Sequence, residues 1–318
     1  MTPEFVKLTL EMTVEDAIEE IRKNGEDAET INVLYVTDDK KILKGVLTIK
    51  ELLLSKKSSK LKDLITENVI AASTSMDQEK IASIFSKYDF LALPVVDKEN
   101  RIVGIVTVDD IIDVIREETT EDFEIMAAIT PADEPYLKSN VFTIWKNRVP
   151  WLLLLMISAT FTGLIINSYE AMLSAALLAC VPMIMDTGGN AGSQASVTVI
   201  RSLAVGELST KDYFKVVWKE IRVSILLGIT LAVACFLKLI LIDRLLFGFV
   251  GYDNLTCLVV SLALFITVVL AKIVGCSLPI LAKKCHLDPA VVASPFITTI
   301  VDATSLILFC LISIAILP

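Results

Sequence analysis

Apolar and polar positions alternate in two different ways along the chain, and the change falls near residue 137. Before it, short β-branched runs such as VLYVT are separated by charged turns and by amphipathic segments at 14–23 and 79–86. After it come five apolar stretches, at about 150–166, 171–203, 216–249, 255–282 and 289–317. A helix of about 20 apolar residues crosses a bilayer. We therefore predict an α-helical transmembrane domain with five spanning helices, preceded by an α/β domain.

The α/β part contains two similar halves. The motif Gly-x-x-Thr-x-x-Glu at 45–51 precedes Gly-x-x-Thr-x-x-Asp at 104–110 by 59 residues, and each half is predicted to run helix, strand, turn, strand, helix. This pattern resembles a tandem pair of CBS domains. We assign 1–118 to the pair (repeats 1–60 and 61–118), 119–148 to an acidic connector or plug helix, and 149–318 to the transmembrane pore domain.

CBS pairs often bind adenine nucleotides between their repeats. The resemblance implies that Thr107 and Asp110 would hold a ribose, whereas Glu51 replaces the usual Asp in the first repeat. A threonine and an acid at this spacing would also cap the helix that follows them. The sequence leaves both interpretations open.

Charge is divided as unevenly as hydrophobicity. Residues 1–135 hold 29 acids and 16 bases, a formal charge of −13, whereas residues 136–318 carry +4. Lys and Arg cluster before the first apolar stretch and in alternate connections between the later ones. This distribution places the N-terminal domain in the cytosol and the C-terminus outside a cell membrane. The six cysteines lie within or beside the apolar stretches, where we interpret them as small apolar fillers.

Acidic residues crowd the segment after the second repeat. A helix there would place Asp110, Asp113, Glu117 and Glu121 on one face, where like charges repel. A divalent cation between two such faces would remove the repulsion, but a solvated face without a ligand explains the pattern equally well. The apolar positions at 125–150 predict a helix along the membrane surface that links these acids to the membrane domain.

One polar stripe crosses the last apolar stretch. Ser294, Thr298 and Asp302 recur every four residues and Ser305 follows, with no base in that stretch to pair with the aspartate. An ionisable residue inside a bilayer usually faces a polar pathway or a polar partner. The stripe therefore favours an ion pathway.

A second polar stripe follows the second apolar stretch. Its glycines and Pro182 are predicted to interrupt the helix and to expose backbone carbonyls to a cavity. Its polar residues recur on one face: Thr187, Asn190, Gln194, Thr198 and Arg201. Close packing of small residues against a neighbouring helix is the alternative interpretation of the glycines.

Carboxylate, amide and carbonyl oxygens suit hard cations, and a single histidine, His286, excludes an HExxH metalloprotease. We expect a channel rather than an enzyme, with Mg²⁺ held in hydrated form and a symmetric homodimer supplying two copies of Asp302. A transporter of Mn²⁺ or Co²⁺ with the same architecture is the main alternative. A CBS-regulated anion channel would need basic residues along its pathway.

The stretches PMIMDTGGNAGSQ, IRSLAVGEL and DPAVVASPFITTIVDATSLI together resemble the MgtE family of Mg²⁺ channels. The resemblance implies a homodimer with five spans per chain, a pore on the dimer axis, Asp302 as the pore carboxylate and Asp288 near its cytosolic mouth. As the residue before Pro289, Asp288 would equally well cap a helix. The expected ion pathway comprises Asp302, Asn190, Gln194, Thr298, Ser294, Gly188, Gly189 and Asp288.

The same resemblance implies gating by cytosolic Mg²⁺. Acids of the second repeat and connector would bind the regulatory ions and close the pore when the ion is abundant: Asp110, Asp113, Glu118, Glu121 and Asp122. The membrane potential would drive entry, and the sequence contains no GxxxxGK[ST] loop for nucleotide hydrolysis.

Overall fold

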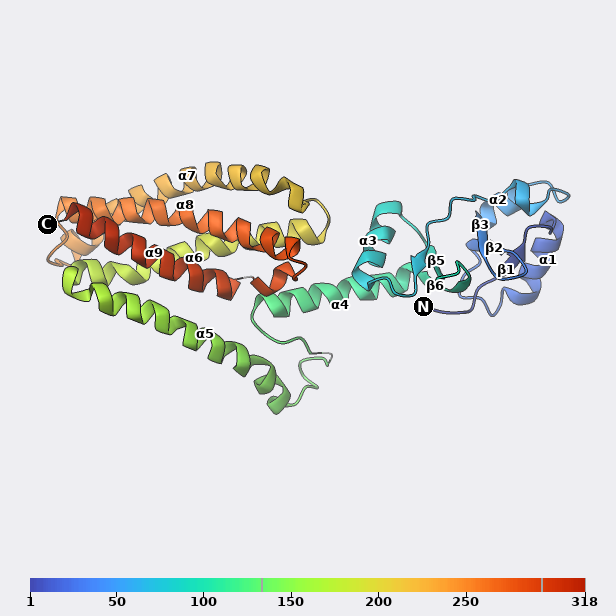
Figure 1. Cartoon of the computed structure of the whole chain (residues 1–318), viewed down its shortest axis with the longest axis horizontal. Helices are drawn as coiled ribbons and strands as arrows, with labels where there is room; N and C mark the ends of the chain where they lie inside the picture. Colours follow the sequence, from blue (N-terminus) through green and yellow to red (C-terminus); the bar gives the residue numbers. More distant parts are fainter. Residues whose placement is uncertain (133, 293, 318) are drawn as a thin grey trace. The chain divides into compact units, whose positions relative to one another are not determined.

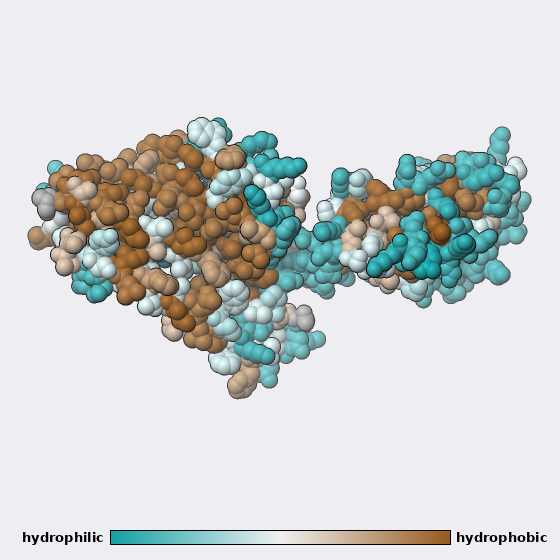
Figure 2. Space-filling model, viewed as in Figure 1, coloured by the Kyte–Doolittle hydropathy of each residue, from teal (hydrophilic) through white to brown (hydrophobic). Residues whose placement is uncertain are grey.

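The computed structural model describes residues 1–132, 134–292 and 294–317, and the side chain of Ser294 lies outside the described part. The chain forms two compact units, Met1–Thr120 and Glu121–Pro318 (Figure 1). On the face drawn in Figure 2, hydrophilic side chains dominate the surface of the first unit and hydrophobic side chains that of the second. This contrast agrees with the predicted order of an α/β domain followed by a helical membrane domain.

Two copies of one motif build the first unit. The first copy contains β1 (Lys7–Thr9), α1 (Val14–Asn24), β2 (Val33–Thr37), β3 (Leu43–Thr48) and α2 (Ile49–Leu54). The second follows a short 3-10 helix, η1 (Leu61–Asp63), and contains β4 (Ala72–Ser73), α3 (Gln78–Tyr88), β5 (Ala92–Val96), β6 (Ile102–Thr107) and α4 (Val108–Met126). Each copy has a three-stranded sheet, β1-β2-β3 or β4-β5-β6, with one parallel and one antiparallel pairing. The predicted tandem CBS fold is confirmed.

The hairpin turns of both repeats are built alike. Asp38 accepts two backbone N–H groups of its own turn at 2.9 and 3.0 Å, and Asp97 accepts the equivalent two at 2.8 and 3.0 Å. One residue of each turn has a left-handed backbone, Lys41 with φ 64° and Asn100 with φ 61°. Because an aspartate bonded to its own turn fixes the hairpin, two different turn sequences give one geometry.

Five long helices form the described part of the second unit: α5 (Val141–Tyr169), α6 (Ala175–Ala204), α7 (Tyr213–Lys238), α8 (Asn254–Lys284) and α9 (Ser294–Ile316). Short 3-10 turns lie between them, namely η2 (Glu170–Met172), η3 (Thr210–Asp212) and η5 (Pro289–Val292), and a π-helical segment, η4 (Leu239–Leu246), extends α7. Helix α8 packs against α6, α7 and α9 and forms the centre of the unit.

Four segments among the described residues are long and apolar enough to cross a membrane: Val141–Met172, Thr210–Leu246, Asn254–Lys284 and Pro289–Ile316. They coincide with the first, third, fourth and fifth predicted spans. Helix α6, the second predicted span, has sufficient length at 30 residues, but its glycines and polar side chains make it less apolar. Length and composition therefore support four of the five expected spans.

Two local predictions are wrong. Residues 141–150 do not form a separate surface helix; they are the first turns of α5, which continues through Pro150. Helix α6 also runs without a break through Pro182 and its glycines. The glycines serve close packing instead: a Cβ added to Gly192 would lie 3.2 Å from the carbonyl oxygen of Ala271 in α8. Small residues let two backbones approach in this way while each helix keeps its own hydrogen bonds.

Candidate functional site

A cleft with a volume of about 420 Å³ opens between helices α5, α6 and α9. Its lining comes mainly from α6 and consists of Ile166, Val181, Pro182, Met185, Asp186, Gly189, Asn190, Thr298 and Asp302. Two carboxylates, one amide and one hydroxyl group therefore share a cleft whose other walls are apolar. Oxygen atoms of these types are the ligands that hard cations prefer.

Helix α6 turns its polar side away from the rest of the unit. Asp186, Asn190, Gln194 and Thr198 follow one another at intervals of four residues, and all four are exposed. Residues at this spacing share one face of a helix, and the opposite face of α6 packs against α8 and α9. In a bilayer this exposed stripe must meet water or another protein surface, because lipid cannot hydrogen-bond to it.

Helix α9 forms the other polar wall of the cleft. Asp302 is half-buried there, while its neighbour Val301 and the preceding Ile297 are completely buried against other helices. The hydroxyl of Thr298 donates to the carbonyl oxygen of Pro295 at 2.9 Å. Its oxygen therefore remains available as an acceptor toward the cleft.

The Asp302 carboxylate has no hydrogen bond or ion pair with any of the described residues. The negative charge of Asp186 acts on it across the cleft. Two carboxylates without a basic partner repel each other, so the cleft favours a cation.

The two central glycines of α6 have different surroundings. Gly189 lines the cleft, and a Cβ on it would lie 3.1 Å from Thr298 Cγ2 and 3.6 Å from Asp302 Oδ1. Gly188 is buried, and a Cβ there would lie 2.8 Å from Thr267 Cγ2 and 3.1 Å from Ser305 Oγ. Gly189 thus allows α9 to approach α6 closely beside the cleft. Gly188 allows close packing with Thr267 and Ser305 away from the cleft.

The structure brings four of the eight predicted pathway residues to the cleft: Asp302, Asn190, Thr298 and Gly189. Gln194 lies one turn beyond Asn190 on the same exposed face of α6. Asp288 is exposed outside the cleft, where its Oδ1 accepts the backbone N–H of Ala290 at 2.8 Å. This contact is the capping interaction that Pro289 suggests. The side chain of Ser294 cannot be placed because it lies outside the described part.

Sequence reasoning missed Asp186 as a site residue. It precedes Asn190 by four residues, and the same periodicity that selects Asn190 and Gln194 therefore selects it. The four-residue spacing was therefore visible in the sequence, but the glycines next to Asp186 led to the prediction of a broken helix at this point.

The five acids of the expected regulatory site all lie on α4. Asp110, Asp113 and Glu121 are exposed, and Glu118 accepts a hydrogen bond from the side-chain amide of Gln78 at 2.7 Å. Within the described residues of one chain, no group of three or more His, Cys, Asp or Glu side chains could hold a metal ion. A metal site made by these acids would therefore need ligands from more than one surface.

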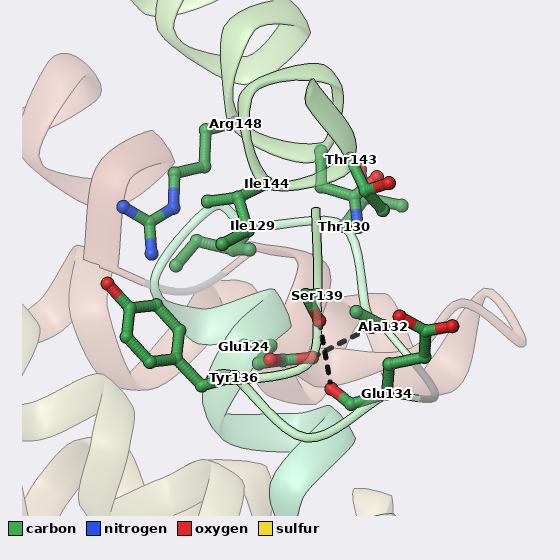
Figure 3. Close-up of a pocket in the computed structure, with 11 residues that line it drawn as sticks. Glu124, Ile129, Thr130, Ala132, Glu134, Tyr136, Ser139, Thr143, Ile144 and Arg148 are labelled. Atoms are coloured by element: carbon green, nitrogen blue, oxygen red, sulfur yellow. Dashed lines mark hydrogen bonds between the residues drawn. The ribbon is translucent and has the colours of Figure 1, made fainter. Parts of the chain in front are cut away.

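The segment after α4 folds back onto the start of α5. The Glu124 carboxylate accepts the backbone N–H of Ala132 at 3.1 Å, and the backbone N–H of Thr130 donates to the carbonyl oxygen of Asn147 at 3.0 Å. Trp151 Nε1 donates to the Thr130 hydroxyl at 3.3 Å. The hollow that these contacts leave, drawn in Figure 3, has a volume of only about 80 Å³. It has room for a few water molecules and not for a nucleotide.

The Gly-x-x-Thr motifs of the two repeats have different hydrogen bonds. In the first, Thr48 and Glu51 form a complete capping box at the start of α2, with the Glu51 carboxylate accepting the Thr48 N–H at 2.7 Å. In the second, Thr107 is buried beside Asp109, and its hydroxyl lowers the pKa of that carboxyl. The helix-capping interpretation is therefore correct for the first repeat. In the second, Thr107 is engaged by Asp109 rather than by Asp110.

Comparison with known proteins gives matches along the whole chain. The sequence profile of the MgtE family, described as a divalent cation transporter, matches residues 181–312, and that of the CBS domain matches 1–57 and 61–117. The chain is 38% identical to "Magnesium transporter MgtE" of Thermus thermophilus over 313 residues, and 36% identical to the protein of the same name from Bacillus subtilis over 312. Each alignment covers 97% of this chain and 67% of the relative, so the chain spans about two thirds of their length.

Among solved structures, the first unit is similar to the cytosolic domain of the Mg²⁺ channel MgtE in complex with ATP. The two are 45% identical over 36% of this chain and 46% of the other, with a TM-score of 0.36.

Proposed function

The chain belongs to the MgtE family of divalent cation transporters, and from this premise we propose that it conducts Mg²⁺ across a cell membrane. The single observation that carries the proposal is the cleft between α5, α6 and α9, where Asp302, Asn190 and Thr298 offer oxygen ligands and the described lining residues include no base. Mg²⁺ gives up its water reluctantly, so a lining of amides, hydroxyls and few carboxylates suits the hydrated ion.

The cleft is one half of the proposed pathway, and a second copy of the chain supplies the other half. The polar stripe of α6 is exposed in the single chain, although this helix belongs among membrane-spanning neighbours. In a homodimer with a two-fold axis along the stripe, both copies of Asp302 face one water-filled path. Helix α6 is then the fifth span, tolerated because its polar face is turned from lipid.

The orientation follows from the Lys and Arg residues of the connections. They lie near the N-terminal end of α5, around the start of α7 and at the C-terminal end of α8, at Lys146, Arg148, Lys211, Lys215, Lys283 and Lys284. Basic connections remain on the cytosolic side. The CBS pair is thus cytosolic and the C-terminus is outside.

The membrane potential supplies the driving force. A dication entering through a potential of about −100 mV releases roughly 4.6 kcal/mol, twice the value for one elementary charge. This free energy corresponds to accumulation of more than about a thousandfold. Coupling to nucleotide hydrolysis is therefore unnecessary.

Regulation is proposed to reside in the exposed acids of the second repeat and connector. Asp110, Asp113, Glu118, Glu121 and Asp122 would bind Mg²⁺ between two surfaces when the cytosolic ion is abundant. The bound ions would cancel the repulsion between these acids and favour the closed state. Several weak sites acting together would make the response steep.

An adenine nucleotide is the second proposed ligand of the cytosolic domain. Its site would lie in the second repeat at Thr107 and Asp110, because Thr48 and Glu51 of the first repeat are committed to the cap of α2. The Thr107 hydroxyl would then turn toward the ribose.

The same architecture transporting Mn²⁺ or Co²⁺ is the second candidate, since the oxygen ligands of the cleft serve those ions as well. Purified protein in lipid vesicles distinguishes the two, by uptake of each ion with internal Mg²⁺ held at low or high concentration. We expect uptake that prefers Mg²⁺ and that falls as internal Mg²⁺ rises. Asp302→Ala should abolish uptake while the protein remains folded; unchanged Mg²⁺ uptake by this variant would refute the pathway.

A further inference from the structure

Asp186 is the second carboxylate of the cleft. It lies on α6 and lines the cleft together with Gly189, Asn190 and Asp302. Its side chain is exposed, and no hydrogen bond or ion pair links it to a described residue.

A buried structural role does not account for this residue. A carboxylate inside a bilayer that served packing would be enclosed and bonded to a neighbouring helix. Asp186 is instead on the outward stripe of α6, four residues before Asn190 and eight before Gln194. An exposed carboxylate on the same face as these amides has access to the water of the pathway.

Two negative charges in one cleft also have an energetic consequence. Each carboxylate raises the free energy of the other when the cleft is empty, and a dication near both removes this repulsion and adds two attractions. The second carboxylate therefore raises the affinity of the cleft for a dication far more than for a monovalent cation. In the proposed dimer, four carboxylates face the path instead of two.

We propose that Asp186 is a second ion-binding residue of the pathway, and that with Asp302 it sets the affinity and charge selectivity for hydrated divalent cations. The proposal rests on the proposed transport function and on the cleft as its pathway. Asp302, half-buried among helices, provides the close contact. Asp186 provides a second, more exposed contact through the hydration shell of the ion.

The test compares Asp186→Asn with Asp302→Asn in the full chain reconstituted in lipid vesicles, with Mg²⁺ uptake measured over a range of external concentrations. Asparagine keeps the size of the side chain and removes only its charge. Coulomb's law for a dication and a carboxylate about 7 Å apart through water predicts that the half-saturating Mg²⁺ concentration rises about tenfold in Asp186→Asn. The inhibitory concentration of hexaamminecobalt(III), which mimics a hydrated cation, should rise at least as much.

Glu170→Gln is the matched control. Glu170 is an exposed acid in η2 outside the cleft, so its neutralisation should leave both concentrations unchanged. If Asp186→Asn shows the same half-saturation and the same inhibition as Glu170→Gln while Asp302→Asn is inactive, Asp186 has no part in ion binding and the proposal is overturned. If neither aspartate variant changes uptake, the cleft is not the pathway and the proposed function fails first.

A variant without any uptake still decides the question. Elution as a single peak in size-exclusion chromatography first establishes that Asp186→Asn is folded. Recovery of uptake in Asp186→Glu, which restores the charge on a longer side chain, then supports the proposal. Loss of uptake in the folded Asp186→Glu variant as well shows that the position requires a shape and not a charge, and contradicts it.

Discussion

The contact between α6 and α8 leaves no room for a side chain at Gly275. A Cβ added there would lie 2.9 Å from the carbonyl carbon of Gly192 and 3.0 Å from its Cα, and closer still to its carbonyl oxygen. Real Cβ atoms do not approach backbone atoms to such distances, and a backbone cannot rotate aside as a side chain can. Replacement of Gly275 by alanine must therefore move the two helices apart, by about 1 Å at this point.

The cost can be worked out from this geometry. Inserting one methyl group into a closely packed contact typically costs about 1–3 kcal/mol. Alanine is a better helix former than glycine by roughly 1 kcal/mol, which offsets part of the cost. The balance is about 0–2 kcal/mol, and because the obstructing atoms belong to the backbone we expect Gly275→Ala at its upper end, a destabilisation of the helical unit by about 2 kcal/mol. Because the far face of α6 carries Asp186 and Asn190, the displacement should also reduce ion uptake.

Thermal unfolding of the detergent-solubilised protein measures this effect. For a unit of this size, a loss of about 2 kcal/mol corresponds to a Tm lower by roughly 4–8 °C. Gly163→Ala in α5 is the matched control, because a Cβ at Gly163 would have no heavy atom within 4 Å. That variant should keep the Tm of the parent or raise it slightly. An equal Tm for Gly275→Ala and Gly163→Ala would refute the close contact between α6 and α8.

Three further predictions concern the cytosolic part. Thr48→Ala removes the capping box of α2 and should destabilise the first repeat by about 1 kcal/mol in chemical unfolding followed by circular dichroism, whereas Thr48→Ser should not. Backbone N–H groups, that of Ile42 foremost, hold the pKa of Asp38 below its usual value, so its stabilising contribution is complete above about pH 4 and is lost as the pH falls through the lowered pKa; Asp38→Asn should flatten this acid dependence, and an unchanged pH profile would contradict it. Neutralising Glu118, Glu121 and Asp122 together should shift Mg²⁺-dependent protection from protease to higher Mg²⁺ concentration, and an unchanged midpoint would place the sensor elsewhere.

The sequence predicted what depends on periodicity and local chemistry. The two repeats followed from strands of period two around charged turns, and the structure adds the reason for their likeness, since Asp38 and Asp97 bind their own turns in the same way. Four of the long apolar helices followed from length and hydropathy. Asp302 and Asn190 were found from the spacing of polar residues along stretches whose length had already predicted membrane-spanning helices.

What the sequence did not predict depends on contacts between distant segments. The glycines of α6 predict a broken helix when they are considered alone, because glycine weakens an isolated helix. Their role becomes clear only with Ala271 and Gly275 of α8 opposite them, some 80 residues later in the chain. The same holds for Gly188, which was expected in the ion pathway, and for Ser305, which periodicity assigns to a polar stripe; the two instead pack together away from the cleft.

The weak hydropathy of α6 and the composition of the cleft have a common cause. Six of the nine residues that line the cleft come from α6, and the two polar ones among them, Asp186 and Asn190, contribute to the low apolarity of this helix. A helix that carried only apolar residues could face lipid on every side, but it would have no side chain to bind a cation. If α6 spans the membrane, its exposed stripe needs an aqueous or protein neighbour that a single chain does not supply over Gln194 and Thr198. The feature that hides this span from hydropathy is therefore also the strongest physical reason to expect a second subunit against it.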